Sequence, residues 1–351
     1  MEKIKIGNRI IGNGTPCFII AEAGVNHNGS LELAKKLIDV AVDAGVDAVK
    51  FQTFKADKLV VPDAEKADYQ KNTAVEEDSQ YQMLKKLELT EHEFMELSSY
   101  AREHDLIFLS SPFDKESADF LDSVSVPIFK ISSGELTNIP LLKHIARKKK
   151  PIILSTGMAT VGEIDEVLST LAKEGSEGII LLHCVTNYPA KMEEVNLNVI
   201  KTLRCCYKLP VGFSDHTPGI VASLAATAMG SCVVEKHFTI DKNLPGPDHS
   251  ASLNPTELKD LVQGIRDIEN AMGDGRKKPT SAEQKIKKFV RKSIVASADV
   301  QTDTVITEYM LDIKRTGEDK GIEPKHWDYI IGSKTKVDLN KDQPIKWNMI
   351  E

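Results

Sequence analysis

The sequence predicts an α/β protein with parallel strands, and three observations support this. Eight short apolar runs recur along the first part of the chain, most are followed by an amphipathic segment of helical period, and each ends in polar residues. Near-continuous apolar runs are typical of parallel strands that are covered on both faces. Eight such βα repeats in about 270 residues predict a TIM (β/α)8 barrel, whose active sites lie at the C-terminal ends of the strands.

The alternative is a doubly wound open sheet. That fold requires a crevice where the strand order reverses, and usually a glycine-rich phosphate loop after the first strand. No GxGxxG motif follows the first apolar run, so the barrel is favoured. The expected strands are Cys17–Ala21, Asp47–Phe51, Leu106–Leu109, Pro127–Phe129, Pro151–Leu154, Gly178–Leu182, Val211–Phe213 and Cys232–Val234.

Helix boundaries are marked by capping residues between these strands. A Ser, Thr or Asn at the N-cap accepts a hydrogen bond from a free backbone amide of the first turn, and a glycine commonly ends the helix. The expected caps are Ser30 and Gly45 around Leu31–Ala44, Thr90 with Glu93 for a helix to about His104, and Asn254 with Pro255 and Gly273 for the last barrel helix.

The barrel domain is expected to span residues 1–273. Residues 1–16 contain three glycines and predict a small hairpin that plugs the barrel floor. A longer polar insertion covers about 53–89 and carries Tyr69-Gln70-Lys71.

The C-terminal part of the chain differs from the barrel in composition and in the length of its apolar runs. A charged linker is expected over 274–289, and a small β-rich domain over 290–351 with strands at Ser293–Ala296 and Val337–Leu339. A domain of this size has a small core, so we expect it to pack on something.

Composition excludes several function classes. The chain has 351 residues and a formal net charge of −7, without a clustered basic face, so nucleic acid is not an expected partner. No signal peptide opens the chain and no apolar run is long enough to span a bilayer, so no membrane association is expected. The five cysteines show no CxxC spacing, which is typical of reduced thiols and favours the cytoplasm.

Two histidines are the strongest metal-site candidates. His216 follows the strand at Val211–Phe213, and His237 follows the strand at Cys232–Val234. The helical segment between the strands makes a βαβ unit, in which both strands are parallel and end at the same edge. Two imidazoles at one edge indicate a metal site, although a single histidine would more simply cap its strand.

The other strand ends carry lysines, hydroxyls and carboxylates. Two lysines with several hydroxyls are typical of a site for phosphate and carboxylate groups. A single Ser or Thr at a strand end is most simply a local hydrogen bonder, but the whole set at one barrel mouth predicts an active site. The set is Glu22, Lys50, Gln52, Ser111, Lys130, Ser133, Glu135, Ser155, Thr186, Tyr188, Ser214, His216, His237 and Asp248.

The motifs at these positions resemble the sialic acid synthase family. The resemblance covers nearly the whole chain in order, and the tail, from Arg291 to Ala296 onward, looks like the antifreeze-like (SAF) domain of that family. The motifs are Ala21-Glu22-Ala23-Gly24-Val25-Asn26-His27-Asn28-Gly29, Lys50-Phe51-Gln52-Thr53, Ser111-Pro112-Phe113, Lys130-Ile131-Ser132-Ser133-Gly134-Glu135, Ser155-Thr156-Gly157-Met158, Gly212-Phe213-Ser214-Asp215-His216, Glu235-Lys236-His237-Phe238 and Gly246-Pro247-Asp248.

The resemblance implies an activity and an assembly. It implies the metal-dependent condensation of phosphoenolpyruvate with N-acetylmannosamine, or a related 2-acetamido or diacetamido sugar, to give a nonulosonic (sialic-type) acid and phosphate. It also implies a homodimer in which the tail domain of one subunit caps the barrel mouth of the other.

The resemblance further implies roles for single residues. His216 and His237 match ligands of Mn²⁺ or Mg²⁺, and Glu22 matches a carboxylate that handles protons. Positions that hold phosphoenolpyruvate match Lys50, Lys130, Ser111, Ser133, Ser155 and Ser214, and positions that contact the sugar match Gln52, Glu135, Tyr188 and Asp248. Lys50, Lys130, Glu22 and Glu135 are the expected catalytic residues.

Two positions depart from the family pattern. Arg315 matches the tail arginine that reaches the partner's sugar acetamido group, but the usual Arg-Pro-Gly-x-Gly-Ile is here the longer Arg315-Thr316-Gly317-Glu318-Asp319-Lys320-Gly321-Ile322. Thr186 lies where some members have Asn, and its expected role is binding of phosphoenolpyruvate.

Other functions stay open at this point. A synthase acting on a phosphorylated aldose would need a second cationic site, and no arginine lies at a barrel strand end, which favours a neutral sugar. A lyase that forms an imine on Lys130 or Lys50 is the second alternative. A non-catalytic sugar-binding module fits only the tail.

Overall fold

The structure is a computed structural model that describes residues 3–66 and 79–351. The chain divides into two compact units, Met1–Gly273 and Asp274–Glu351. In the described part of the chain, no helix is long and apolar enough to cross a membrane.

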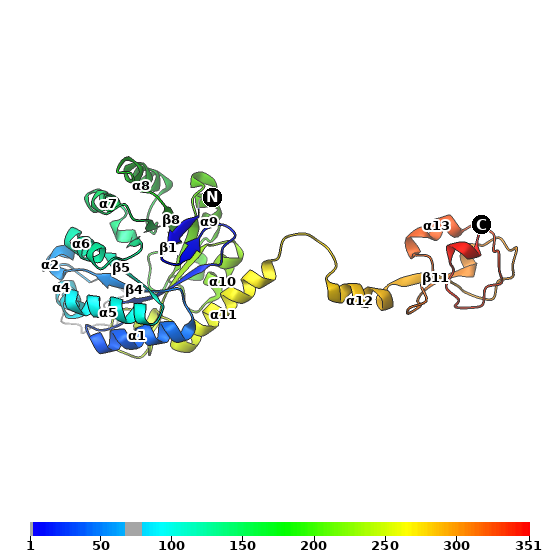
Figure 1. Ribbon diagram of the computed structural model, residues 1–351, viewed down its shortest axis with the longest axis horizontal. Coiled ribbons are helices and arrows are strands. Elements are labelled where there is room, and N and C mark those ends of the chain that lie inside the picture. The colour runs from blue at the N-terminus through cyan, green and yellow to red at the C-terminus, as the bar shows by residue number, and fades with distance from the viewer. Residues whose placement is uncertain (1–2, 67–78) are drawn as a thin grey trace. The chain divides into compact units, whose positions relative to one another are not determined.

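The first unit is a parallel barrel, as predicted (Figure 1). Its strands pair in the order β5-β4-β3-β10-β9-β8-β7-β6, and the two end strands, β5 and β6, also lie in contact. The first and last strands of the barrel, β3 and β10, are therefore neighbours, with Glu22 opposite His237. The strands are β3 (Phe18–Gly24), β4 (Ala48–Thr53), β5 (Ile107–Pro112), β6 (Phe129–Ile131), β7 (Ile152–Ser155), β8 (Ile179–Cys184), β9 (Val211–Asp215) and β10 (Val233–His237).

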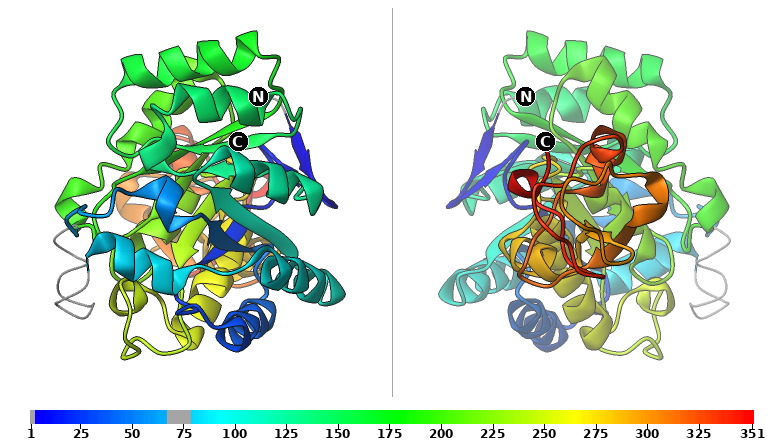
Figure 2. Two further views of the ribbon diagram at one scale, coloured as in Figure 1. Left: turned by 90° about the vertical axis from the view of Figure 1, so that its left-hand side faces the viewer. Right: turned by 90° about the vertical axis from the view of Figure 1, so that its right-hand side faces the viewer.

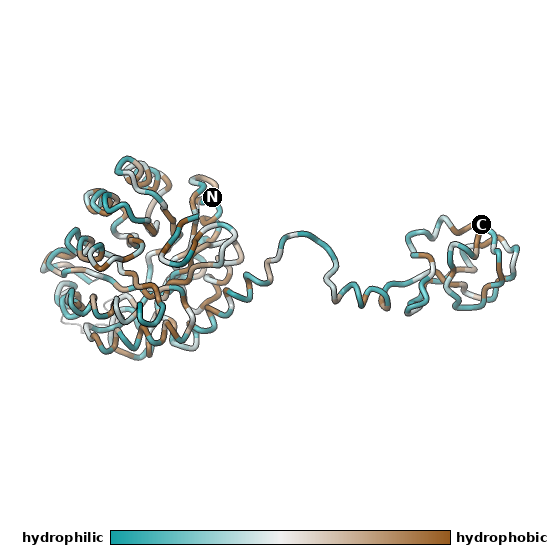
Figure 3. Tube along the Cα trace, viewed as in Figure 1, coloured by the Kyte–Doolittle hydropathy of each residue, from teal (hydrophilic) through white to brown (hydrophobic). Residues whose placement is uncertain are grey.

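A ring of helices surrounds the strands (Figure 2). Their apolar faces pack on the outward-facing strand residues and form the larger hydrophobic core. In Figure 3 hydrophobic stretches run along the strands and alternate with hydrophilic ones along the helices. The ring consists of α1 (Leu31–Ala44), α5 (Glu91–Glu103), α6 (Lys115–Ser123), α7 (Ile139–Ala146), α8 (Val161–Lys173), α9 (Asn198–Tyr207), α10 (Val221–Ala228) and α11 (Pro255–Met272).

The predicted helix caps are confirmed. Ser30 accepts a hydrogen bond from the backbone amide of Leu33, and Gly45 ends α1 with a φ of 75°. Thr90 with Glu93, and Asn254 with Glu257, form complete capping boxes. These caps fix the residue at which each of the three helices begins.

Alternate strand residues point into the barrel, and the lower ones are apolar. A hairpin of β1 (Ile4–Ile6) and β2 (Arg9–Ile11) places three isoleucines against this inner cluster, which confirms the predicted plug of the barrel floor. Packing inside the barrel is close at Gly212, where an added Cβ would lie 2.5 Å from the carbonyl oxygen of Val233. The inward-facing strand residues are thus apolar at the floor and polar at the opposite, C-terminal end of the barrel.

In its described residues, the insertion after β4 contributes the short helices α2 (Ala56–Leu59) and α4 (Gln80–Leu87). They hold a small apolar cluster of Val25, Phe54, Met83 and Leu87. Tyr69-Gln70-Lys71, expected in this insertion, lies outside the described residues.

The second unit differs from the expectation in two places. The predicted linker contains a helix, α12 (Ser281–Val290), because Thr280 and Glu283 form a capping box ahead of an amphipathic run. After this helix, strands β11 (Lys292–Ala296) and β12 (Leu311–Arg315) of the second unit pair antiparallel. Val337–Leu339 was wrongly predicted as a strand: it makes a single β-bridge, between Leu339 and Val300. The unit also has the short helix α13 (Trp327–Ile330) and a core of its own around Ile294.

Candidate active site

The predicted residues meet in one cavity at the C-terminal ends of the barrel strands. Its volume is about 390 Å³. The alternation that fills the floor with isoleucine and leucine brings every second residue at the strand ends into this space. The predicted residues that line it are Glu22, Lys50, Gln52, Ser111, Lys130, Ser133, Glu135, Ser155, Thr186, Tyr188, Ser214, His216 and His237.

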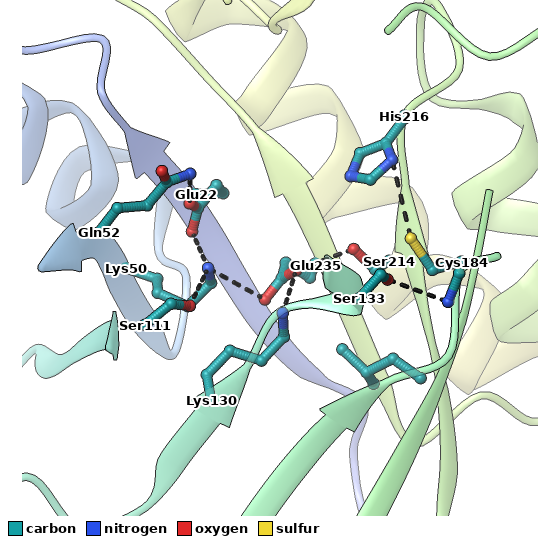
Figure 4. A network of polar contacts seen from close by, with 12 residues as sticks. Glu22, Lys50, Gln52, Ser111, Lys130, Ser133, Cys184, Ser214, His216 and Glu235 are labelled. Carbon is teal, nitrogen blue, oxygen red and sulfur yellow. Dashed lines mark hydrogen bonds and ion pairs between the residues drawn. The ribbon is translucent and has the colours of Figure 1, made fainter. Parts of the chain in front are cut away.

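A buried network of four charges forms the bottom of the cavity (Figure 4). Lys50 Nζ lies 2.6 Å from Glu22 Oε2 and 3.7 Å from Glu235 Oε2. Lys130 Nζ lies 3.2 Å from Glu235 Oε1. All four side chains are at most 5% exposed, so their charges interact with little screening by water.

Hydroxyl and amide groups complete this network. Lys50 donates a hydrogen bond of 3.1 Å to Ser111 Oγ, and Ser214 donates one of 2.8 Å to Glu235. The Gln52 amide lies 3.4 Å from Glu22 Oε1. These partners hold the two carboxylates in place between the lysines.

The two carboxyl groups have opposite pKa shifts. Burial raises the pKa of Glu22 to about 7, although Lys50 opposes this. Burial also acts to raise the pKa of Glu235, but Lys130 and Lys50 outweigh it and lower the pKa to about 2. Glu22 is therefore the group of this network that can exchange a proton near neutral pH.

The lysines also differ from each other. Burial acts to lower the pKa of Lys50, but Glu22 and Glu235 outweigh it and the pKa is raised. Burial lowers the pKa of Lys130, against the effect of Glu235. With Glu22 protonated, the network carries one excess positive charge and suits an anion.

Two hydroxyls at the ends of β6 and β7 lack hydrogen-bond partners. The Oγ atoms of Ser132 and Ser155 are buried without a hydrogen-bond partner. Ser133 Oγ accepts a hydrogen bond of 3.0 Å from the backbone amide of Gly157. An added Cβ at Gly157 would lie 2.1 Å from Thr186 Oγ1, so only glycine allows these loops to approach so closely. Buried hydroxyls without partners beside two lysines indicate a place for an oxyanion.

The imidazoles lie on another side of the cavity. The ring centroids of His216 and His237 are 5.5 Å apart, and Tyr188 lies 4.0 Å from the first ring and 5.4 Å from the second. His216 Nδ1 lies 2.7 Å from the carbonyl oxygen of Val185, an acceptor that requires the proton on Nδ1, so Nε2 is the nitrogen that a metal could use. His237 Nδ1 is buried without a hydrogen-bond partner, 3.7 Å from Asp248 Oδ2.

This donor set fits a divalent metal. An imidazole nitrogen without a protein partner and a second, buried ring nitrogen without one are groups that a metal ion would satisfy. Among the described residues, no three or more His, Cys, Asp or Glu side chains surround one metal position. His216 and His237 are the residues that would hold such an ion.

Two predicted residues do not line the cavity. Asp248 is buried beside His237 and reaches the site through that contact. Arg315 belongs to the second unit, where it ends β12 and is exposed opposite Lys292.

The structure adds cavity residues that were not predicted: Leu59, Gln80, Phe113, Ser132, Gly134, Met158, Cys184 and Glu235. A strand period of two would have found Glu235 and Cys184, because Glu235 is two residues before His237 and Cys184 two after Leu182. Leu59 and Phe113 come from the insertion and a loop, where sequence pattern gives no such signal.

Known proteins match both units of the chain. Residues 37–277 match the model of the NeuB family, and residues 291–351 match the SAF domain. N,N'-diacetyllegionaminic acid synthase of Campylobacter jejuni is 51% identical over 93% of this chain and 98% of its own length. The synthase of the same name from Legionella pneumophila is 48% identical over 97% and 96%.

A solved structure agrees with this. The crystal structure of N-acetylneuraminic acid (sialic acid) synthetase from Leptospira borgpetersenii in complex with citrate is 36% identical, with a TM-score of 0.72, and the match covers 82% of this chain and 96% of that one. The barrel, the charged cavity at its mouth and these likenesses together show that the chain is an enzyme of the NeuB family with a C-terminal SAF domain.

Proposed function

We propose that the chain condenses phosphoenolpyruvate with an N-acetylated amino sugar and water, giving a nonulosonic acid and phosphate. One observation carries the proposal: two buried lysines, unpartnered serine hydroxyls and two imidazoles line a single cavity. Such a cavity offers separate places for an anion beside the lysines and for a carbonyl group beside the imidazoles. The named relatives are acid synthases, which supports the same reaction here.

Phosphoenolpyruvate would occupy the lysine side of the cavity. Lys50 and Lys130 supply charge to its phosphate and carboxylate groups, and the serine hydroxyls supply donors. The hydroxyls are those of Ser111, Ser133, Ser155 and Ser214, with Thr186 at the rim. The lysines act as preorganised cations, so no imine forms in this mechanism.

His216 and His237 would hold Mn²⁺ or Mg²⁺, and a metal at this place acts as a Lewis acid toward the aldehyde oxygen of the open-chain sugar. The bond between phosphoenolpyruvate C3 and the aldehyde carbon forms while positive charge develops at C2. Water adds at C2, and phosphate leaves by cleavage of the C2–O bond.

The protein residues manage protons and orientation in this reaction. Glu22, whose pKa is raised to about 7, would start protonated, donate that proton to the sugar oxygen as the C–C bond forms, and take a proton from the water that adds at C2. The second proton of that water leaves with phosphate. Gln52, Glu135, Tyr188 and Asp248 would orient the sugar. Asn138 donates a hydrogen bond of 2.6 Å to Glu135 and fixes its carboxylate at the rim.

A Schiff-base lyase is the second candidate, and one observation favours it. The pKa of Lys130 is lowered by burial, as an imine-forming lysine requires. The ion pair of Lys130 with Glu235 and the acid synthases among the relatives favour the condensation instead. Borohydride added with pyruvate would trap a covalent adduct only on a lyase.

We also propose that the enzyme is a homodimer whose subunits exchange SAF domains. Arg315 is exposed at the end of β12 and would donate to the acetamido carbonyl of a sugar in the partner's cavity. Mixing inactive Arg315→Ala with inactive His237→Ala subunits tests this. Exchange in trans restores one intact site per heterodimer, whereas a lid in cis restores none.

The function itself is tested by product identification. Enzyme, phosphoenolpyruvate, Mn²⁺ and N-acetylmannosamine or a diacetamido hexose should release phosphate and give a nonulosonic acid in the mass spectrum. A chelator should stop the reaction. Phosphoenolpyruvate left intact with every sugar would reject the proposal.

A further inference from the structure

Two asparagines join the loop that follows β3 to the segment that follows β10. Asn26 Nδ2 donates to the carbonyl oxygen of Phe238 at 2.8 Å and to Ser252 Oγ at 2.9 Å. Asn28 Nδ2 donates to the carbonyl oxygen of Pro245 at 2.8 Å. Since β3 and β10 are neighbours in the barrel, these bonds link the first and the last loop at its mouth.

His249 extends this link from the 3-10 helix η3 (His249–Ala251). Its side chain is 0% exposed, with Nε2 3.2 Å from Asn28 Oδ1 and Nδ1 2.6 Å from Thr239 Oγ1. Because the amide nitrogen of Asn28 already donates to Pro245, Oδ1 is the acceptor and His249 Nε2 carries the proton. The hydroxyl of Thr239 then donates to Nδ1. Burial lowers the pKa of His249 to about 4, so at neutral pH the ring is neutral and can both donate and accept.

Gly246 shows how closely the two loops approach each other. It has a φ of +148°, and an added Cβ would lie 2.7 Å from Asn28 Oδ1 and 2.7 Å from His249 Cδ2. Only glycine fits in this space. The turn that leads to Asp248 therefore lies directly on the bond between Asn28 and His249.

Asp248 is the residue that this link holds in place. Its side chain is 8% exposed, and Oδ2 lies 3.7 Å from His237 Nδ1. Ser252 Oγ donates a hydrogen bond of 2.6 Å to the carbonyl oxygen of Asp248, and His249 is the next residue of the chain. Within the described part of the chain, no group donates a hydrogen bond to the carboxylate itself. The backbone on either side of Asp248 therefore sets the direction of its carboxylate.

We infer that His249 is a positioning residue for Asp248. Its bonds to Asn28 and Thr239 fix the turn from which the Asp248 carboxylate reaches His237, and so hold that carboxylate where the sugar would bind. The inference rests on the proposed condensation and adds a residue that acts on the sugar without touching it. A displacement of about 1 Å at an active site can cost about 100-fold in rate, so loss of this link should be visible in the kinetics.

The first test is the kinetics of His249→Ala. Phosphate release is measured with phosphoenolpyruvate and the acetamido sugar on which the wild type is most active, and each substrate is varied in turn. We expect kcat/KM for the sugar to fall about 10- to 100-fold, as is usual when the partner of an active-site residue is removed, while the KM for phosphoenolpyruvate changes less than about twofold. His249→Gln keeps a donor for Asn28 and should recover most of the loss. His249→Asn is too short to reach Asn28 and should not.

Asn28→Gly removes the other end of the same bond. Asn28 has a φ of +51°, which glycine adopts readily, so this variant keeps the backbone free of strain. It should reproduce the kinetics of His249→Ala. The two changes together should cost little more than either alone, because they break one shared link.

A second mutant cycle shows whether His249 acts through Asp248. Asp248→Asn alone should lower kcat/KM for the sugar. Adding His249→Ala should lower it no further, because the carboxylate that the ring positions is already gone. Losses that multiply would mean that His249 acts independently of Asp248.

His183→Ala is the matched control for the loss of a buried histidine. His183 is 6% exposed and its Nε2 lies 2.6 Å from the carbonyl oxygen of Val195, but it does not line the cavity. This variant should unfold at a lower urea concentration and keep the wild-type KM for both substrates. If His249→Ala behaves in the same way, its role is structural and the inference fails.

The outcomes separate the two proposals. Unchanged sugar kinetics in His249→Ala and Asn28→Gly, an equal loss for both substrates, or multiplying losses with Asp248→Asn overturns the positioning role and leaves the condensation standing. If His249→Ala does not fold, Asn28→Gly and His249→Gln decide. No phosphate release by the wild type with any acetamido sugar rejects the condensation, and the inference with it.

Discussion

Strands β9 and β10 carry two buried charge networks that face opposite sides of the barrel wall. On the inside, Glu235 pairs with Lys50 and Lys130. On the outside, its neighbour Lys236 pairs with Asp215 at 3.0 Å, and both side chains are at most 1% exposed. The networks are equally buried, and adjacent residues of the same strand supply them.

The networks differ in whether all of their polar atoms have hydrogen-bond partners. Asp215 accepts hydrogen bonds from the amide and hydroxyl of Thr217, both 2.8 Å, and from Ser223 at 2.6 Å. Lys236 also donates to the carbonyl oxygen of Thr217. Inside, Ser132 Oγ, Ser155 Oγ and His237 Nδ1 have no partner. A saturated network ties α10 to the barrel, whereas an unsaturated one is built for a ligand.

The largest effect is expected at the imidazoles. His216→Ala should abolish turnover, because one of the two proposed ligands is lost and the remaining ring cannot hold the ion alone. Calorimetric titration with Mn²⁺ checks binding without relying on activity. Chelation of the wild type should likewise stop turnover, and Mn²⁺ should restore it. Undiminished activity in His216→Ala would contradict the metal site.

A loss of about 1,000-fold in kcat/KM, or about 4 kcal/mol, is expected for Lys130→Met. The variant keeps the bulk of the side chain but removes the charge proposed for phosphoenolpyruvate. Steady-state kinetics with varied phosphoenolpyruvate provide the measurement. If those kinetics stay as in the wild type, the assignment of the inner network to substrate fails.

Lys236→Met is the matched change on the outside. It leaves the Asp215 carboxylate buried without its cation and should lower the free energy of unfolding by about 3–5 kcal/mol. The folded enzyme should keep activity of the same order. Urea unfolding gives the first quantity, and kinetics below the transition give the second. Adding Asp215→Asn should recover part of the stability. Loss of turnover without loss of stability would show that the outer network serves the reaction and not the fold.

The smallest effects are expected for a pair of serines. Ser223→Ala removes a hydrogen bond to a charged group and should cost about 2 kcal/mol of stability, with little change in kinetics. Ser155→Ala removes a hydroxyl without a protein partner, so stability should change by less than about 0.5 kcal/mol while the KM for phosphoenolpyruvate rises. Equal stability losses in the two variants would show that the inner hydroxyl is not reserved for a ligand.

The barrel and most of its mouth could be predicted because they follow from strand periodicity. A parallel barrel forces each strand end to the same rim, so Lys50, Ser155 and His237 could be grouped from sequence alone. Glu235 was missed although it shares the inward face of β10 with His237.

Features without periodicity could not be predicted in this way. Leu59 of the insertion and Phe113 of the loop after β5 both line the cavity, and no spacing rule in the sequence groups them. In the SAF domain, burial alternates only weakly along strand β12, where Leu311 alone is buried. This strand was not predicted. The capping box at Thr280 was a readable signal that was overlooked in a charged segment.

The isoleucine plug at the barrel floor has a consequence for kinetics. Because apolar side chains fill the lower end, substrates reach the cavity from the carboxyl ends of the strands. The residues proposed for phosphoenolpyruvate lie deepest, with Lys50 and Lys130 each 3% exposed, while Gln52 and Glu135 are half-buried nearer the rim. A sugar bound first would obstruct the route to the lysines. If phosphoenolpyruvate binds the lysines as proposed, we expect it to bind before the sugar, and we expect the sugar to be an ineffective ligand of the enzyme by itself.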